Sequence, residues 1–206
     1  EFIASIVKTL GKPVLVEMWE ERFFYFVLKW DFNFVDNQNK AAALSTDQID
    51  VENAKRYEIT YVDEKGEKCY PLILHCSPSG AIERDVYALL EKAYRTQQKR
   101  KAPMLPVWLS PTQVRIIPIS DSFLKDVEGF AEEMEKHKVR VDIDDRSLTL
   151  QKKVREAEMD WVPYIIVVGK KELESGMLPV RERSSGEMRK VQLSDLLNTI
   201  GKITAG

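Results

Sequence analysis

The spacing of the hydrophobic residues changes near the middle of this 206-residue chain. Before residue 96, apolar and polar residues mostly alternate, which is typical of consecutive strands in an antiparallel sheet. After residue 103, short apolar segments alternate with amphipathic segments, a pattern that predicts βαβ units and a largely parallel sheet covered by helices on both faces. The polar, basic run Thr96–Pro103 separates the two patterns and ends in proline. We therefore predict two domains of different class, at residues 1–103 and 104–206.

The first domain is predicted to consist mainly of strands. A short helix ends at Gly11, and a second helix starts near Gly80 and runs to Lys92 or slightly beyond. The turn residues Asp63–Gly66 predict a hairpin between two of the strands. The first helix is predicted at residues 3–10, and the strands at residues 14–18, 23–36, 42–51, 57–62 and 67–74.

The second domain is predicted to alternate strands with helices. The helix that starts near residue 121 is predicted to have Asp121 or Ser122 as its N-cap. Taken alone, the segment that holds Glu172 and Glu174 is predicted to be a polar turn. The predicted strands lie at residues 113–118, 139–143, 163–168, 177–183 and 188–192, and the helices at residues 121–138, 148–159 and 194–203.

The composition limits the class of protein. Hydrophobic residues make up 44% and charged residues 31% of the chain, which indicates folded globular domains rather than disorder. The net charge of −2 argues against a charge-dominated binder such as a histone, but does not exclude a local RNA-binding surface. Cys69 and Cys76 lie outside any CxxC pair, and no apolar run is long enough to cross a membrane. We therefore expect a reduced, cytoplasmic protein with no membrane partner.

One strand–turn–helix segment carries residues that suit the binding of a nucleotide and a small polar molecule. His75 lies at the end of an apolar strand, and Arg84 follows nine residues later in the first turn of a helix. Imidazole is a good metal ligand, and guanidinium is a permanent cation that matches phosphate oxygens. Taken alone, a histidine at a strand end is more often structural, and an arginine is more often a surface ion-pair partner.

Several phrases of the sequence are similar to the class II aminoacyl-tRNA synthetases. The segment Pro71–Glu91 resembles motif 3 of that class, and Leu44–Asp50 resembles a substrate-contacting strand of the threonyl-tRNA synthetase family. The second half resembles the anticodon-binding domain of the class, in an archaeal-type form. The matching phrases are PVWLSP at residues 106–111, DDRS at 144–147, KVRE at 153–156, WVPY at 161–164 and GKKELESG at 169–176.

This resemblance implies a fold. It predicts an α+β first part, the distal portion of a class II antiparallel catalytic sheet. An α/β anticodon-binding domain with a mixed five-stranded sheet is expected to follow it.

The resemblance also implies roles for residues of the first half. His75 corresponds to one ligand of an active-site zinc ion, and Arg84 to the motif 3 arginine that contacts ATP. Arg84 and Gln48 are implied as catalytic residues, and ATP is expected to bind with Mg²⁺. Ala81 replaces a serine of bacterial relatives. The implied ATP-binding residues are Lys29, Thr46, Gly80 and Arg84.

In the second half, the resemblance implies an anticodon-binding surface. Glu172 and Arg181 correspond to positions that read anticodon bases, because carboxylate and guanidinium groups suit the edges of unstacked bases. Trp161 stands where bacterial relatives carry an arginine, so a stacking contact is expected there. The remaining implied anticodon-binding residues are Arg146, Ser147 and Arg155.

The implied enzyme activates threonine with ATP, transfers it to tRNA(Thr), and works as a homodimer. Its other zinc ligands, its motif 2 arginine and its dimer-forming motif 1 are expected upstream of this sequence. The chain is therefore expected to be a C-terminal fragment that is inactive alone. Two alternatives stay open: a non-catalytic tRNA-binding protein that retains a catalytic remnant, and an editing-type paralogue with a shortened catalytic domain.

Overall fold

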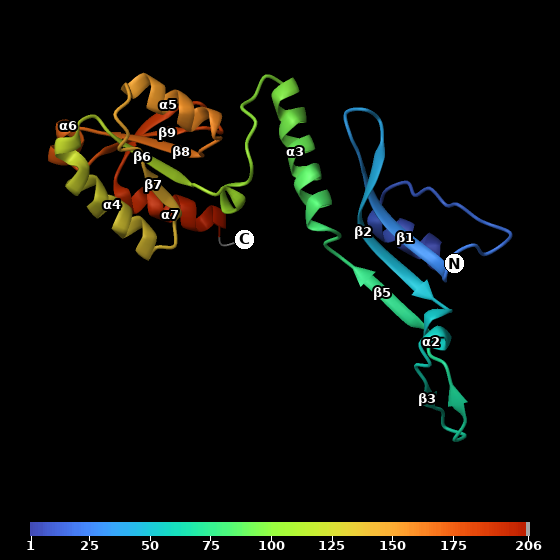
Figure 1. The fold of residues 1–206 in the computed structure, drawn as a ribbon. Helices are drawn as coiled ribbons and strands as arrows, with labels where there is room; N and C mark the ends of the chain where they lie inside the picture. Colours follow the sequence, from blue (N-terminus) through green and yellow to red (C-terminus); the bar gives the residue numbers. More distant parts are fainter. Residues whose placement is uncertain (205–206) are drawn as a thin grey trace. The chain divides into compact units, whose positions relative to one another are not determined.

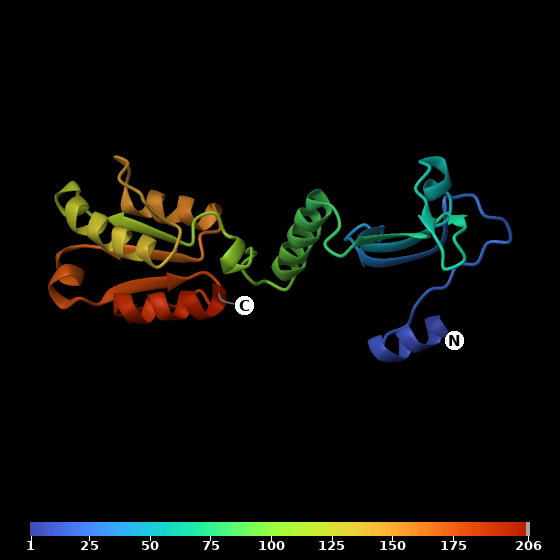
Figure 2. The ribbon, with the colours of Figure 1, turned by 90° about the horizontal axis from the view of Figure 1, so that it is seen from below.

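The computed structural model describes residues 1–204, except for the side chain of Phe2. The chain forms two compact units, Glu1–Asp85 and Val86–Gly206 (Figures 1 and 2). Helix α3 (Ile82–Gln98) starts in the first unit and continues into the second. A domain boundary at residue 103 stays a prediction.

The first unit is built on a three-stranded antiparallel sheet with strand order β1-β2-β5. These strands are β1 (Phe26–Val35), β2 (Ala41–Asp50) and β5 (Ile73–Ser77). Helix α1 (Phe2–Leu10) precedes them. Between β2 and β5 lie α2 (Asn53–Arg56) and a hairpin of β3 (Tyr61–Val62) with β4 (Lys68–Cys69). The strand predictions for β1 and β2 and the hairpin turn are confirmed.

Two strand predictions in this unit are wrong, and of a third, at residues 57–62, only Tyr61–Val62 is a strand. Residues 14–18 form no strand: Leu15 and Met18 are 95% and 90% exposed, and no described segment pairs with them. The predicted strand at residues 67–74 is instead divided into β4 and β5. Pro71 lies between the two pieces and has no backbone N–H to donate to a neighbouring strand, which explains the interruption.

The second unit contains a five-stranded sheet with strand order β10-β9-β8-β6-β7 (Figure 1). Its strands are β6 (Val114–Pro118), β7 (Val141–Ile143), β8 (Tyr164–Val168), β9 (Leu178–Glu182) and β10 (Met188–Val191). Strands β7, β6 and β8 are parallel, whereas β9 pairs antiparallel with β8, and β10 pairs antiparallel with β9. The mixed sheet implied by the resemblance is confirmed, and the largely parallel sheet predicted from periodicity is wrong. Residues 169–177, which join β8 to β9, are too few for a crossover between parallel strands.

Helices cover both faces of this sheet. Helices α4 (Leu124–Lys136) and α7 (Leu193–Thr204) pack on one face, and α5 (Leu150–Met159) packs on the other. The larger core includes Val127 and Met134 of α4 and Ile200 of α7, together with Ile116 and Ile166 of the sheet. The smaller core joins Ala157 of α5 to Ile117 and Ile165. The alternating strand residues thus face two cores, as expected for strands buried on both sides.

Three further elements differ from prediction. The predicted helix at residues 121–138 starts as the short 3₁₀ helix η2 (Asp121–Phe123), and its N-cap is Ser120, whose hydroxyl accepts the Ser122 N–H. The segment predicted as a polar turn is helix α6 (Lys170–Ser175), because the Glu172 carboxylate accepts the Gly169 N–H at its first turn. A 3₁₀ helix, η1 (Val107–Leu109), was not predicted.

Candidate functional site

Four residues proposed for catalysis, ATP binding or zinc binding share one face of the first unit's sheet. Lys29, Gln48 and His75 stand opposite one another on β1, β2 and β5. Thr46 lies two residues from Gln48 on β2, paired with Asp31 on one side and Ser77 on the other. Residues paired across strands project to the same face, so a polar surface extends over all three strands.

A buried carboxylate supports this surface from the end of β2. Asp50 is fully buried and accepts the backbone N–H groups of Glu52 and Asn53, each at 2.9 Å. It also contacts the Nδ2 of Asn53 at 2.5 Å and the Nε2 of His75 at 2.8 Å. Burial alone raises the pKa of the Asp50 carboxyl, but the hydrogen bonds from Asn53, His75 and Glu52 outweigh burial and lower the pKa far below 3.8.

The ionised Asp50 determines which ring nitrogen of His75 carries the hydrogen. A carboxylate only accepts hydrogen bonds, so the Nε2 of His75 must donate and a neutral ring keeps its lone pair on Nδ1. Tyr25 adds to this arrangement: its ring lies 5.6 Å from that of His75, and its hydroxyl donates to Gln48 at 2.5 Å. The sequence analysis did not propose Asp50 or Tyr25 as site residues. The strand alternation that places Asp50 with Thr46 and Gln48 was the available signal.

The turn after β5 brings Gly80 and Arg84 against β2. Gly80 has a φ of 70°, and a Cβ atom there would lie 1.7 Å from the carbonyl oxygen of Leu44. Only glycine therefore fits this close approach of two backbones. Arg84 donates from Nη1 to the Ala43 carbonyl at 3.2 Å and is otherwise exposed. Lys29 pairs with Asp31 at 3.2 Å.

In the second unit, some of the proposed anticodon-binding residues lie beyond the carboxyl ends of β7 and β8. Arg146 contacts Asp144 at 2.8 and 2.7 Å and Glu156 at 2.8 Å, while Ser147 is exposed beside it. Glu172 uses one carboxylate oxygen to accept the Gly169 N–H at 3.0 Å. Arg146 and Glu172 are thus held in place by the fold itself.

Arg155, Trp161 and Arg181 lie towards the opposite end of the sheet. Arg155 and Arg181 line a hollow of about 350 Å³ between α5 and the β9–β10 hairpin. Arg181 pairs with Glu158 at 2.8 Å, whereas Arg155 has no partner among the described residues. Arg181 stands opposite Ile165 of β8. Ile165 precedes Gly169, the N-cap of α6, by four residues, so about 13 Å of strand separates Arg181 from the start of the helix that holds Glu172. The proposed anticodon-binding residues therefore form two groups.

Arg183 completes the second group and was not proposed from the sequence. Its guanidinium donates to the Pro103 carbonyl at 2.8 Å and to the Glu158 carbonyl at 2.6 Å, and it lies 5.9 Å from the Trp161 ring. Burial lowers the pKa of this group, and the charge of Glu158 opposes that shift. Trp161 has a φ of 57°, a left-handed conformation that is unusual for tryptophan.

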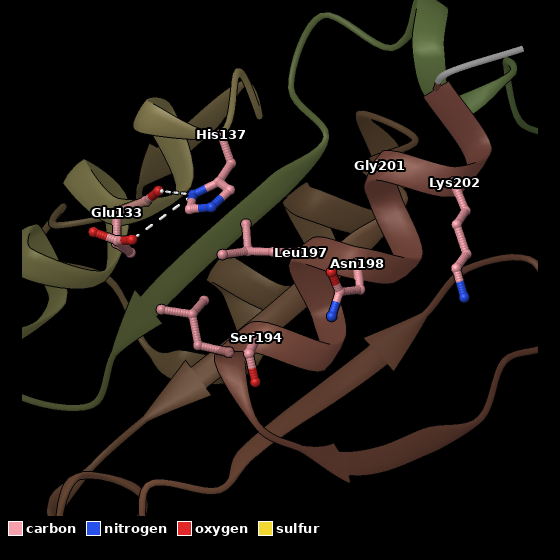
Figure 3. Close-up of a pocket in the computed structure, with 8 residues that line it drawn as sticks. Glu133, His137, Ser194, Leu197, Asn198, Gly201 and Lys202 are labelled. Carbon is pink, nitrogen blue, oxygen red and sulfur yellow. Dashed lines mark hydrogen bonds and ion pairs between the residues drawn. The ribbon is translucent and has the colours of Figure 1, made fainter.

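A larger open groove of about 670 Å³ lies on the other face of the sheet, between α4 and α7. Figure 3 shows His137 beside Glu133 at one wall and Leu197, Asn198 and Lys202 along α7 at the other. None of the proposed anticodon-binding residues lines this groove. The His137 Nδ1 lies 2.9 Å from the Glu133 carbonyl in the last turn of α4, in agreement with an exposed residue at a helix end.

Residues 1–204 contain neither a membrane-spanning helix nor a cluster of metal-binding side chains. No helix in that range is long and apolar enough to cross a membrane. No group of three or more histidine, cysteine, aspartate or glutamate side chains in that range could hold a metal ion. Cys69 and Cys76 are both free thiols.

Residues 113–203 match the family described as "Anticodon binding domain". The threonine–tRNA ligase of Thermococcus gammatolerans is 58% identical over 206 residues, that of Pyrococcus horikoshii 56% over 206, and that of Nitrosopumilus maritimus 54% over 204. The match covers 100%, 100% and 99% of this chain, respectively. The resemblance to archaeal threonyl-tRNA synthetases is confirmed.

The chain spans 33% of the length of each of these three synthetases. A solved structure, the RNA binding domain of threonyl-tRNA synthetase from Cryptosporidium parvum, has a TM-score of 0.76 and 23% sequence identity. The match covers 98% of this chain and 48% of the chain of that solved structure. At that identity the likeness concerns the fold, and it confirms an antiparallel sheet followed by a mixed five-stranded sheet.

The Asp144–Arg146 pair predicts a pH dependence of stability. Hydrogen bonds from the Arg146 side chain lower the pKa of Asp144 below 3.8, although burial opposes the shift. An aspartate in the unfolded chain has a pKa of about 3.9, so the stabilisation is present above about pH 4 and is lost as the pH falls further. We expect Asp144→Asn to cost about 1–3 kcal/mol near neutral pH and to flatten the loss of stability in acid.

Urea unfolding of the chain at a series of pH values measures this effect. Asp145→Asn, in the exposed neighbouring residue, is the matched control and should leave the profile unchanged. Equal acid dependence in the native chain and Asp144→Asn would contradict the assigned role of Asp144.

Proposed function

We propose that this chain is part of a threonyl-tRNA synthetase and that its second unit binds the anticodon loop of tRNA(Thr). The identity of 53–58% to threonine–tRNA ligases along essentially the whole chain carries the proposal. The arrangement of the second unit supports it, because guanidinium and carboxylate groups line a hollow beside α5, and the Trp161 indole lies 5.9 Å from the guanidinium of Arg183 at that hollow. These are the side chains that recognise unstacked bases of single-stranded RNA.

Each group of side chains in the second unit has its own task in this proposal. Arg181 presents its free N–H groups to the edge of a base, and the partly exposed indole of Trp161 stacks on another. Arg155, which lacks a carboxylate partner among the described residues, attracts a phosphate. About 13 Å of strand separates Ile165, which stands opposite Arg181, from Gly169 at the start of α6. Arg181 and Glu172 therefore contact different nucleotides.

Replacing Arg181 tests base recognition. Arg181→Ala should weaken binding of the threonine anticodon stem-loop roughly tenfold to a hundredfold, since a base-edge contact contributes about 1–3 kcal/mol. Glu172→Gln should also weaken it while keeping the helix cap, because glutamine serves the same position of a capping box. Titration at one fixed salt concentration gives the dissociation constants.

Glu174→Gln provides the control for that titration, since Glu174 is an exposed residue of α6 outside the proposed surface. It should bind as tightly as the native chain. Stem-loops with unrelated anticodons should bind more weakly than the threonine stem-loop. Equal binding of all stem-loops to the native chain would overturn the proposed function and would favour a non-specific RNA-binding relative.

The first unit supplies part of the site for threonine activation in this proposal. In the complete enzyme, the threonine carboxylate displaces pyrophosphate from ATP, and the terminal ribose of the tRNA then takes the threonyl group and releases AMP. Arg84 binds ATP phosphates together with Mg²⁺, and Gly80 lets the backbone approach the nucleotide. Lys29, Thr46 and Gln48 position the substrates from the polar face of the sheet. A homodimer and a cytoplasmic location are part of the same proposal.

Arg84→Ala tests this role in the longer, complete protein. Threonine-dependent exchange of pyrophosphate into ATP should fall by about a hundredfold or more, because a phosphate-binding cation stabilises the transition state. Lys92→Ala, in an exposed residue of the same helix, should leave the exchange unchanged. Full exchange activity in Arg84→Ala would remove Arg84 from the site.

The surroundings of His75 fit one ligand position of a zinc site. Zinc-binding histidines commonly donate their second ring N–H to a carboxylate, and the buried Asp50 accepts such a hydrogen bond from Nε2. The lone pair on Nδ1 is then available to the metal. The zinc ion, when bound, would hold the amino and hydroxyl groups of threonine, and valine lacks that hydroxyl.

Zinc content of the complete protein tests this assignment. His75→Ala should reduce the bound zinc severalfold, and Asp50→Asn should weaken zinc affinity by about tenfold to a hundredfold. His137→Ala is the control, because His137 lies at the end of α4 in the other unit. Unchanged zinc content in His75→Ala would exclude His75 as a ligand.

A further inference from the structure

We propose that Glu158 of α5 is a positioning residue that makes Arg181 read a base edge instead of a phosphate. The inference rests on the proposed function, since it assigns a cause to the anticodon preference of that same surface. Glu158 Oε1 lies 2.8 Å from the Nη2 of Arg181, and the two side chains are 40% and 44% exposed. The pair therefore stands at the surface where RNA can reach it.

Glu158 is itself held in place by its backbone. Arg183 donates from Nη1 to the Glu158 carbonyl at 2.6 Å and from Nε to the Pro103 carbonyl at 2.8 Å. The contact with the Glu158 carbonyl fixes the last turn of α5 against Arg183, which directly follows β9. The carboxylate of Glu158 thus approaches Arg181 from a defined direction.

The other charged groups around the hollow either have partners of their own or carry a positive charge, so Glu158 is the carboxylate that contacts Arg181. Glu182 is paired with Arg189 and accepts the Ser184 hydroxyl, so its carboxylate is engaged by the β9–β10 hairpin. Arg183 is engaged by two carbonyl groups. Arg155 has no carboxylate partner among the described residues, and it supplies attraction for the RNA backbone.

The chemistry of the pair explains how it favours specific binding. Guanidinium has five N–H donors in a fixed plane, and a carboxylate that takes one of them fixes the direction of the rest. The negative charge of Glu158 also repels phosphates, so Arg181 gains little from a non-specific backbone contact. Base edges carry acceptors without a full negative charge, and they can approach Arg181 with less repulsion.

A purely structural ion pair makes a different prediction. An exposed pair contributes about 0–1 kcal/mol to stability, and its loss would change the binding of every stem-loop alike. A positioning residue changes cognate and non-cognate RNA differently. The preference for the threonine anticodon therefore separates the two roles.

Glu158→Gln tests the proposal, because glutamine keeps the shape of the side chain and removes its charge. Binding of stem-loops with unrelated anticodons should tighten roughly threefold to tenfold. The preference for the threonine anticodon should fall about tenfold or more. The plot of log affinity against log salt should become steeper by about 0.7, as Arg181 becomes free to contact one phosphate of a single strand.

Glu187→Gln is the matched control, since it removes the same charge from an exposed residue of the β9–β10 turn. It should leave both the preference and the salt slope unchanged. In an Arg181→Ala background, Glu158→Gln should no longer alter the preference, because the residue through which it acts is absent.

The outcomes separate this inference from the function on which it rests. A native chain without anticodon preference would overturn both. A native chain with preference, and a Glu158→Gln variant that keeps it, would overturn only the role of Glu158. The same conclusion would follow if Glu158→Gln changed the preference equally with and without Arg181.

Discussion

The central strands of the second unit are buried on both faces, and this determines where charged side chains can reach the solvent. Ile116 and Ile117 of β6 face opposite cores, as do Ile165 and Ile166 of β8, and all are at most 4% exposed. The proposed anticodon-binding residues therefore lie outside β6 and β8: Arg146 and Glu172 lie beyond strand ends, Arg155 on α5 and Arg181 on β9. The proposed anticodon-binding residues form two groups because those are the places that the core leaves open.

Carboxylates of α5 and the preceding loop orient the arginines at both places. Arg146 lies between Asp144 and Glu156, and Arg181 faces Glu158. Such pairs add little stability at a surface, but they fix the direction in which a guanidinium points. They also explain how a chain with a net charge of −2 can bear the proposed RNA-binding surface. Oriented cations, more than a large positive potential, are suited to distinguish one loop from another.

The sequence predicted most elements, because hydrophobic spacing reports which residues are buried. It failed where an element depends on a partner: residues 14–18 have strand-like spacing but no described strand to pair with, and β9 is antiparallel because its connection is short. Helix α6 was not predicted, because it depends on the hydrogen bond from the Gly169 N–H to the Glu172 carboxylate, which the spacing of hydrophobic residues does not report. Resemblance proposed His75 and Arg181 as site residues. Their partners Asp50 and Glu158 became visible only in the folded chain, since both contacts join residues distant in sequence.

The carboxylate that orients the proposed site residue is buried in the first unit and partly exposed in the second. Asp50 is fully buried and receives several hydrogen bonds, so its charge is fixed and His75 has a single consistent donor position. Glu158 is partly exposed, so water and salt weaken its hold on Arg181. A rigid tautomer suits a metal ligand, which must keep one lone pair directed at the ion. A weaker, screened contact suits the proposed RNA recognition, in which Arg181 exchanges part of its hydrogen bonding when a base arrives.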